Sequence, residues 1–411
     1  MLDNNKQLIQ LNEYYNGEIE KLEIPFTDEE INIIENEYYN KLEIIFKRHG
    51  KVIIKTQQYV GYIILPNHII SIIPKIPKVS FINMVKYALQ LPELKSEEFE
   101  ISEENNYYDI LVLFLFQQLE ILIQRGLNTG YKIYEENLNK VKGKILFKEN
   151  IAINFNRPDK IFCLFSETSQ DILENQIIKY VIYHLSQCYF IDESINVKLI
   201  NYYNQLDSIS LVPVSLDIFS TIEYTPLNEH YRTILTLCEL LLKDSSIDEE
   251  NIGEKTAISF LIDMNKLFEK FVVNILRETL PRIDNKYKIY EQNKEYADIQ
   301  KELELRIDIL ITCNNKPSMI LDTKYMEFET KPSSSHLAQM NLYSDIKKVK
   351  NCGLIFPGTN KNIIYPLEII GLNLHILFFD IQAETHHEFK NKCNLFVNSL
   401  IDIVNSFRSI D

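Results

Sequence analysis

Apolar positions along the chain recur with two spacings, which predict both strands and helices. Short runs rich in Val, Ile and Tyr, bounded by turn residues such as Pro66-Asn67, predict strands. Longer stretches with apolar residues three and four positions apart predict helices. In the N-terminal part, the expected strands 51–56, 59–65 and 69–74 follow one another closely. We therefore expect a small antiparallel meander there.

Helices are expected from Thr27 onward, and between about 165 and 245 the pattern is mostly helical. Thr27 begins the first expected helix, because Glu30 follows three positions later as in a capping box. The other expected helices are 81–91, 109–125, 169–190, 195–206 and 228–243, with short strands at 131–134 and 144–147. The polar stretch 244–254 interrupts this pattern and is the best candidate for a linker.

After this stretch the order of elements changes. A helix over 262–280, ended by Pro281, precedes three expected strands, a helix over 334–349 and a strand over 352–356. The three strands are 287–291, 303–312 and 317–325, and strands 363–366 and 374–379 and a helix 384–407 complete the chain. This order predicts a mixed sheet flanked by helices.

The predicted fold class is therefore α/β and α+β in a multidomain chain. We expect a small β-containing N-terminal domain over 1–160, a helical middle region and linker over 161–250, and the mixed-sheet domain over 251–411. A length of 411 residues agrees with two or three domains.

Charge and cysteine content narrow the classes of function. The net charge of -15 means that the molecule as a whole does not attract DNA, so any grip on nucleic acid is local or shared with a partner. Six scattered cysteines form no CxxC pair, which fits a reducing cytoplasm and neither a zinc site nor a disulfide framework. The sequence shows no signal peptide core at its start and no run long enough to span a membrane, so we expect a cytoplasmic protein.

Candidate chemistry lies in two of the apolar strands of the last third. Asp322 and Lys324 are two positions apart, so they share one face of a strand while Thr323 points to the other. If strands 303–312 and 317–325 form a hairpin, Asp308 joins them. Two carboxylates and an amine would then converge, as in a Mg²⁺ site that hydrolyses phosphodiesters.

Further residues extend this candidate site. Asp308 and Asp322 are the expected metal ligands, with the backbone carbonyl of Thr323 as a third and Glu269 of the preceding helix facing the site. The following helix presents Gln339 and Tyr343 on one face, four positions apart. Other interpretations stay open: an ordinary same-face ion pair for Asp322 and Lys324, a surface acid for Glu269, and helix packing for Gln339 and Tyr343. His336, near the helix start, is expected at the rim.

These motifs together resemble a known group of nucleases. Asp308, the triplet Asp322-Thr323-Lys324 and the spacing Gln339-x-x-x-Tyr343 resemble the PD-(D/E)xK nuclease superfamily and its RecB-like branch. More closely, the chain resembles the McrC family, the nuclease subunits of McrBC modification-dependent restriction systems. Three further segments support the resemblance to the McrC family. They are Lys142-Gly-Lys-Ile-Leu-Phe-Lys148, Cys163 through Asn175-Gln-Ile-Ile-Lys179, and Val60-Gly-Tyr-Ile-Ile with Ile73-Pro-Lys-Ile76. Ile307 stands where the superfamily often has proline.

The resemblance implies an activity and partners. It implies a Mg²⁺-dependent endonuclease that cuts double-stranded modified DNA with a McrB-like AAA+ GTPase hexamer, whose GTP hydrolysis it stimulates. The partner binds GTP, and this chain, which has no P-loop, is expected to bind no nucleotide. Self-association through the complex is implied as well. The candidate docking segments are 59–75 and the turn 142–144.

Two other functions remain open from the sequence. The first is a regulatory subunit that activates the GTPase and whose nuclease domain is idle. Intact Asp308, Asp322 and Lys324 favour cleavage over this alternative. The second is a RecB-like repair nuclease, against which the scattered cysteines speak because such enzymes often hold a cysteine-bound iron–sulfur cluster.

Overall fold

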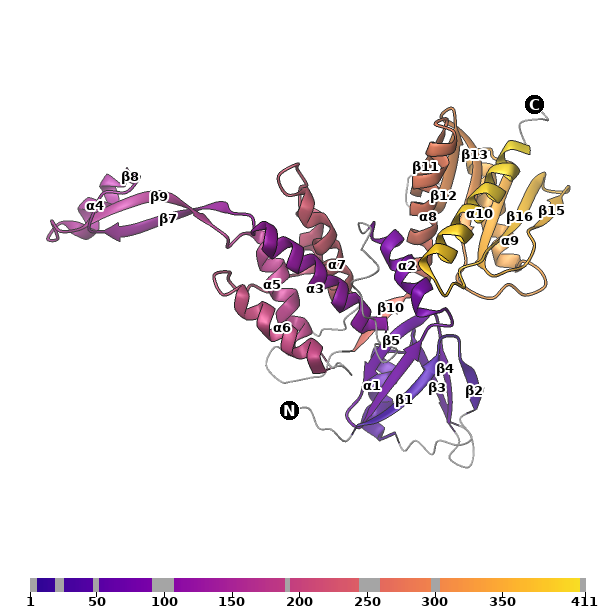
Figure 1. Ribbon diagram of the computed structural model, residues 1–411, viewed down its shortest axis with the longest axis horizontal. Coiled ribbons are helices and arrows are strands. Elements are labelled where there is room, and N and C mark those ends of the chain that lie inside the picture. Colours follow the sequence, from indigo (N-terminus) through magenta and orange to yellow (C-terminus); the bar gives the residue numbers. More distant parts are fainter. Residues whose placement is uncertain are drawn as a thin grey trace. The chain divides into compact units, whose positions relative to one another are not determined.

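The chain forms two compact units, shown in the computed structural model of Figure 1. The structure describes residues 6–18, 26–46, 52–90, 107–188, 193–243, 259–296 and 304–406. One unit joins residues 1–102 with 259–411, and the other contains residues 103–258. The predicted three consecutive segments are therefore replaced by one discontinuous and one continuous unit, because the chain returns to its first unit after residue 258. The expected linker 244–254 lies outside the described residues.

The N-terminal part of the first unit contains two small sheets rather than one meander. β5 (Tyr59–Ile64) and β6 (His68–Ile73) pair antiparallel, and β1 (Gln7–Asn12) lies parallel to β6. β4 (Val52–Thr56) instead pairs with β2 (Asn16–Glu18) and β3 (Leu42–Phe46). Ile54 of one sheet and Ile63 of the other belong to the same buried cluster. The expected meander is wrong because two packed layers bury apolar faces that a single sheet would expose.

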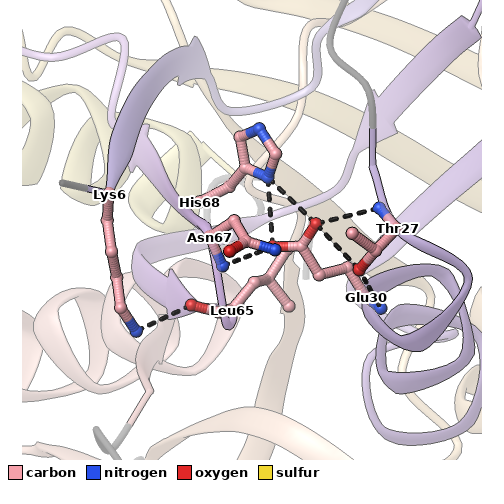
Figure 2. Close-up of polar contacts among 6 residues, drawn as sticks. All are labelled: Lys6, Thr27, Glu30, Leu65, Asn67 and His68. Carbon is pink, nitrogen blue, oxygen red and sulfur yellow. Dashed lines mark hydrogen bonds and ion pairs between the residues drawn. The ribbon is translucent and has the colours of Figure 1, made fainter. Parts of the chain in front are cut away.

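Helix α1 (Asp28–Glu37) is attached to this core through a buried carboxylate, as Figure 2 shows. The predicted capping box is confirmed: Glu30 Oε2 accepts from the Thr27 N–H at 3.1 Å. Its Oε1 accepts from the Asn67 N–H at 2.7 Å, and His68 Nδ1 lies 3.0 Å from both oxygens. Burial by itself would raise the pKa of Glu30, but the backbone donors and His68 outweigh it and lower the pKa. Glu30 thus fixes α1 to β6.

The chain re-enters the first unit as a strand, not as the helix expected from residue 262. β10 (Phe260–Asp263) pairs antiparallel with β5 and places Leu261 opposite Gly61. Gly61 has a φ of +143°, and a Cβ there would lie 2.0 Å from the Phe260 carbonyl oxygen. Only glycine permits this close approach of the two strands.

Helix α8 (Met264–Ile283) follows directly after β10. Its N-cap is Asp263, whose side chain accepts from the N–H groups of Asn265 and Lys266. The helix passes through Pro281 rather than ending there, and Asp284 N–H closes its last turn on Leu280 O. The predicted helix end is therefore wrong by about one turn, because proline still tolerates helical φ near a helix terminus.

A six-stranded mixed sheet forms the rest of the first unit, as the order of elements predicted. Its spatial order is β11-β12-β13-β14-β16-β15. β11 (Tyr287–Tyr296), β12 (Glu304–Cys313) and β13 (Lys316–Thr323) are antiparallel neighbours. β14 (Asn351–Pro357) is parallel to β13 and to β16 (Leu372–Phe379), and β15 (Ile363–Leu367) closes the edge antiparallel to β16.

Helices cover both faces of this sheet. Helix α9 (Ser334–Lys347) contributes Met340 and Tyr343 to a cluster with Ile320, Leu354 and Ile376. On the opposite face, Phe379 stacks on Phe271 of α8 and on Phe396 of α10 (His386–Ser406). Helix α2 (Lys78–Ala88) packs against α8 and α10. Alternating side chains of the strands therefore point to α9 or to the α8 and α10 layer.

The second unit is a small group of helices with a long hairpin attached. Its helices are α3 (Tyr107–Arg125), α5 (Leu173–Leu185), α6 (Glu193–Gln205) and α7 (Arg232–Lys243), joined by short turns η2 (Leu216–Thr221) and η3 (Glu229–Tyr231). The helical pattern predicted for this region is confirmed. None of the helices within the described ranges is long and apolar enough to cross a membrane.

The hairpin is a two-stranded ribbon of β7 (Gly130–Leu138) and β9 (Ile161–Ser169), which extends from the helices of its unit in Figure 1. Its far end carries β8 (Lys144–Ile145), which lies within the expected strand 144–147. It also carries a short helix, α4 (Phe147–Asn154), where the sequence pattern predicts no helix. At its base, Asn175 Nδ2 donates to the carbonyls of Asn128 and Gln170, and Tyr231 OH donates to Asn175 Oδ1. Asn175 thus joins the hairpin to the helices.

Candidate active site at the end of the six-stranded sheet

Asp308, in the middle of β12, and Asp322, near the end of β13, lie side by side. The register pairs Ile309 with Leu321, so the next residues outward, Asp308 and Asp322, face each other on the same side of the sheet. This is the hairpin that the sequence predicted. Asp308 Oδ2 also accepts from the backbone N–H of Thr323 at 3.2 Å. Asp322 is only 1% exposed, so the two carboxyl groups meet in a place where charge is costly.

Lys324 is the cation closest to Asp322. Its Nζ lies 2.7 Å from Asp322 Oδ2. Its backbone N–H donates to the carbonyl of Ile355 on β14 at 2.8 Å, which continues the pairing of β13 and β14 by one residue. The spacing of two residues thus puts the acid and the amine on one face, as predicted, while Thr323 points to the other face.

Gln339 and Tyr343 complete a polar network above the sheet. Gln339 Nε2 donates to Asp322 Oδ1 at 3.0 Å and to the Tyr343 hydroxyl at 3.1 Å, and its Oε1 lies 3.5 Å from Lys324 Nζ. The Tyr343 hydroxyl donates to the carbonyl of Arg306 on β12 at 2.7 Å. Both side chains therefore take part in the site, and Tyr343 also packs in the core. The helix-packing interpretation is therefore confirmed for Tyr343, and a role in catalysis stays a prediction.

The electrostatics of the site favour neutralisation of its acids. Burial raises the pKa of Asp308, and the charges of Asp322 and Glu269 add to this shift. The Thr323 N–H and Lys324 oppose it, and the resulting pKa is about 7. Burial also raises the pKa of Asp322, while Lys324 acts in the opposite direction. A pair of crowded carboxyl groups with raised pKa values is a common feature of functional sites. A divalent cation would relieve the same repulsion.

Glu269 lies near the acid pair but does not join it. It belongs to α8, on the opposite face of the sheet from α9, and its Oε1 accepts from Gln292 Nε2 at 3.2 Å. Burial raises the pKa of Glu269, and Glu291 and Asp322 add to this effect. Within the described ranges, no three His, Cys, Asp or Glu side chains are gathered as a metal-binding group. The Asp308 and Asp322 pair and the Thr323 carbonyl remain as oxygen donors of the kind that Mg²⁺ binds with several waters.

His336, expected at the rim of the site, is neither fully buried nor fully exposed. It is partly buried in the first turn of α9, and its Nδ1 is buried without a hydrogen-bond partner among the described residues. Burial lowers the pKa of His336, Lys324 lowers it further, and Asp322 opposes this shift. These interactions place the imidazole within electrostatic reach of the acid and lysine pair.

One contact of the site has no counterpart in the predictions from sequence. Tyr325, the residue after Lys324, donates its hydroxyl to Glu13 Oε1 at 2.9 Å. Glu13 follows β1, in a region where the residue pattern predicts no element. No sequence signal links the two positions, because they are 312 residues apart and meet only in the folded unit.

The fold and this site define a mixed α/β protein with a close pair of acids, an ion-paired lysine and a bridging glutamine on its sheet. A family model described as the McrBC 5-methylcytosine restriction system component matches residues 54–357. The chain belongs to this family, and the resemblance to McrC that its motifs predicted is confirmed.

Known relatives agree with this assignment. The chain is 23% identical over 329 residues to a protein of Escherichia coli K12 named as the type IV methyl-directed restriction enzyme EcoKMcrBC, covering 76% of this chain and 94% of the relative. Among solved structures it resembles a chain of the Thermococcus gammatolerans assembly of McrB AAA+ hexamers with bound McrC. That match has a TM-score of 0.64 at 20% identity and covers 97% of this chain and 100% of the other. This second likeness concerns the fold.

Proposed function

We propose that this chain is the DNA-cleaving subunit of a McrBC-like restriction system, a Mg²⁺-dependent endonuclease with a PD-(D/E)xK fold. The observation that carries the proposal is the pair of Asp308 and the buried Asp322, with the Lys324 ammonium 2.7 Å from Asp322. Support also comes from the order of helices and strands around it and from the Gln339 and Tyr343 network.

The donor set fits a hard divalent cation. Asp308, Asp322 and the carbonyl of Thr323 would hold Mg²⁺, with Glu269 outside this group. When bound, Mg²⁺ supplies a Lewis acid that makes water more nucleophilic and stabilises charge on the phosphodiester. The raised pKa of Asp308 agrees with this use, since a carboxyl group that is costly to ionise alone is ionised readily beside a cation.

The protein's own residues have separate roles in this proposal. Lys324 carries a positive charge at the edge of the acid pair, with 22% of its side chain exposed, so it can orient the attacking water and stabilise developing negative charge. Gln339 fixes the rotamer of Asp322 through its amide N–H. Tyr343 in turn fixes Gln339 and ties α9 to β12 through Arg306. Together they hold the reacting groups in one geometry before DNA arrives.

The proposal includes a partner, a McrB-like AAA+ GTPase hexamer, and modified double-stranded DNA as substrate. Because the chain has a net charge of -15, it repels DNA as a whole, and a partner would supply most of the contacts that bind the DNA. The hairpin of β7, β9 and α4 is the best docking element, because it exposes large apolar side chains that water disfavours. They include Tyr131, Ile133, Phe147, Ile151 and Phe155.

This assignment modifies the docking segments expected from sequence. Residues 142–144 lie on the hairpin, and Lys142 pairs with Glu167 and lies 4.1 Å from the centre of the Phe165 ring. Residues 59–75 instead form β5 and β6, whose side chains are mostly buried in the first unit. The segment 59–75 is therefore part of the core and offers little surface to a partner.

A second candidate function has one observation in its favour. The described residues contain no group of three acidic, histidine or cysteine ligands, which favours an activator of the partner GTPase with an idle cleavage site. In that case substitution of the acid pair would change neither DNA nor GTP turnover. The two candidates therefore differ in a single measurement.

The test uses the full chain with its cognate GTPase, Mg²⁺, GTP and a DNA duplex that contains 5-methylcytosine. We expect Asp322→Ala to abolish strand cleavage and to leave stimulation of GTP hydrolysis unchanged. The exposed Asp345→Ala on α9 serves as the matched control and should cut like the wild type. Cleavage by Asp322→Ala at the wild-type rate would refute the proposed site.

A further inference from the structure

Tyr325 connects the candidate active site with the N-terminal sheets of the same unit. It follows Lys324 directly and is 4% exposed. Its hydroxyl donates to Glu13 Oε1 at 2.9 Å, and its backbone carbonyl accepts from the Tyr14 hydroxyl at 2.6 Å. Two consecutive residues of the turn between β1 and β2 therefore hold both the side chain and the backbone of Tyr325.

This turn is itself firmly held. Glu13 N–H donates to the Ile73 carbonyl at 2.9 Å, and Tyr14 N–H donates to the Gln57 carbonyl at 3.0 Å. Tyr14 adopts a left-handed backbone conformation with a φ of 52°, which is unfavourable for a residue with a side chain. Such strain persists only where the surrounding structure determines it, and it is often found at functional positions.

Burial of the Glu13 carboxyl group costs free energy, which argues against a purely structural role for this contact. Glu13 is 1% exposed, and its Oε1 accepts from both the Tyr325 hydroxyl and the Lys75 N–H at 2.7 Å. Its Oε2 is buried without a hydrogen-bond partner among the described residues. Burial raises the pKa of Glu13 to about 7. Apolar side chains would join two layers at lower cost than a buried carboxyl group, so the contact serves geometry rather than stability.

The segment that Glu13 and Tyr14 hold carries the active-site lysine. Between β13 and α9 the chain has no regular structure, so its path depends on individual contacts. At Lys324 the backbone is held by the Ile355 carbonyl, and at Tyr325 by the Tyr14 hydroxyl. The Tyr325 ring also packs on Phe268 of α8, with ring centres 5.6 Å apart. Release of Tyr325 would free the backbone directly beside Lys324.

We propose that Glu13 and Tyr14 are positioning residues for Lys324, acting through Tyr325. The N-terminal sheets would then be part of the cleavage centre and not a separate docking domain. This inference rests on the proposed function for its effect on DNA cleavage, but the attachment itself can be measured without cleavage.

The first experiment measures hydrogen exchange of the full chain in peptides that contain the Lys324 amide. We expect Tyr325→Phe, which loses only the hydroxyl, and Glu13→Ala to speed exchange there by about tenfold, in the range of one lost hydrogen bond. Glu13→Gln keeps an oxygen acceptor and should restore slow exchange. Tyr287→Phe is the matched control. The Tyr287 hydroxyl donates to Asn405 Oδ1 of α10, and Tyr287 pairs with Cys313, at the end of β12.

The second experiment measures single-turnover cleavage of the 5-methylcytosine duplex with the cognate GTPase at saturating DNA. Tyr325→Phe and Glu13→Ala should lower the cleavage rate about tenfold or more, with unchanged DNA binding measured in Ca²⁺. Glu13→Gln should retain most of the rate. Tyr287→Phe should lower the melting temperature by a similar amount as Tyr325→Phe and cut normally.

The outcomes separate the two proposals. Unchanged exchange at Lys324 in Tyr325→Phe and Glu13→Ala overturns the positioning role, whatever the enzyme does. Faster exchange with a normal cleavage rate overturns it as well. If the variants show faster exchange but the wild-type protein itself cleaves no DNA, the attachment is supported and the proposed nuclease function is refuted. A loss of cleavage in Tyr287→Phe equal to that in Tyr325→Phe would reduce the effect to general destabilisation and also count against the inference.

Discussion

The Nζ of Lys324 lies 2.7 Å from Oδ2 of Asp322, although the acid is 1% exposed and the lysine side chain is 22% exposed. The lysine therefore lies between the buried Asp322 and solvent. This position lets one cation compensate the buried carboxylate in the free protein and still face a phosphodiester that approaches from solvent. The first prediction follows from this double role.

Replacement of Lys324 by Met should lower both the stability of the protein and its rate of DNA cleavage, and the two effects can be measured separately. Loss of the ammonium leaves Asp322 buried without its cation, so we expect the free energy of unfolding to fall by up to about 3 kcal/mol at pH 8. Cleavage should fall at least about 100-fold. Urea unfolding and the duplex cleavage assay measure the two effects. Lys331→Met, at an exposed position of the following loop, is the control. Normal cleavage by Lys324→Met would remove the lysine from the mechanism.

Replacement of Asp308 by Asn should stabilise the metal-free protein at alkaline pH. The pKa of Asp308 is raised to about 7 in the folded chain, so the folded state holds this proton more tightly than the unfolded state. Its contribution to stability is complete below about pH 4 and is lost as the pH rises through about 7. Asn carries no proton to lose. The melting temperature of Asp308→Asn in EDTA should therefore exceed that of the wild type more at pH 8 than at pH 5.

The control for this prediction is Asp345→Asn, whose side chain is exposed on α9. Its melting temperature should follow the wild type across the same pH range. A melting difference for Asp308→Asn that does not grow with pH would show that the acid pair is not under electrostatic strain.

Replacement of Gly61 by Ala should break the connection between β5 and β10. A Cβ at this position would lie 2.0 Å from the Phe260 carbonyl oxygen, so the strands would have to separate. We expect a loss of more than about 3 kcal/mol in unfolding free energy, against about 1 kcal/mol for Gly371→Ala. Gly371 also has a positive φ of +66°, but a Cβ there would meet nothing within 4 Å. Equal losses in both variants would mean that backbone strain alone matters at Gly61.

Replacement of Phe155 by Asp should abolish partner activation without unfolding the chain. Phe155 is 84% exposed near the far end of the hairpin, so a charge there costs little in the free protein but is unfavourable in an apolar interface. We expect at least a tenfold loss in stimulation of the cognate GTPase. Leu227→Asp, at an 83% exposed position of the same unit outside the hairpin, should stimulate normally. Full stimulation by Phe155→Asp would remove this end of the hairpin from the docking surface.

The sequence by itself predicted the local structure around the site and the elements that carry it. A spacing of two residues places Asp322 and Lys324 on one face of a strand, and a spacing of four places Gln339 and Tyr343 on one face of a helix. These are properties of backbone geometry and need no tertiary information. The order of helices and strands also predicted the mixed sheet, because apolar runs of these lengths have few ways to be buried together.

Only the tertiary structure decided how distant segments are joined. The return of the chain as β10 against Gly61, the separation of β4 from the β5 and β6 hairpin, and the contact between Glu13 and Tyr325 each bring together residues from separate stretches of sequence. The pattern of apolar residues within one strand does not identify these partners, because a strand with one apolar face can be buried against any matching layer. The sequence therefore determined the chemistry that the sheet can present, and the packing of the first unit decided which residues hold that chemistry in place.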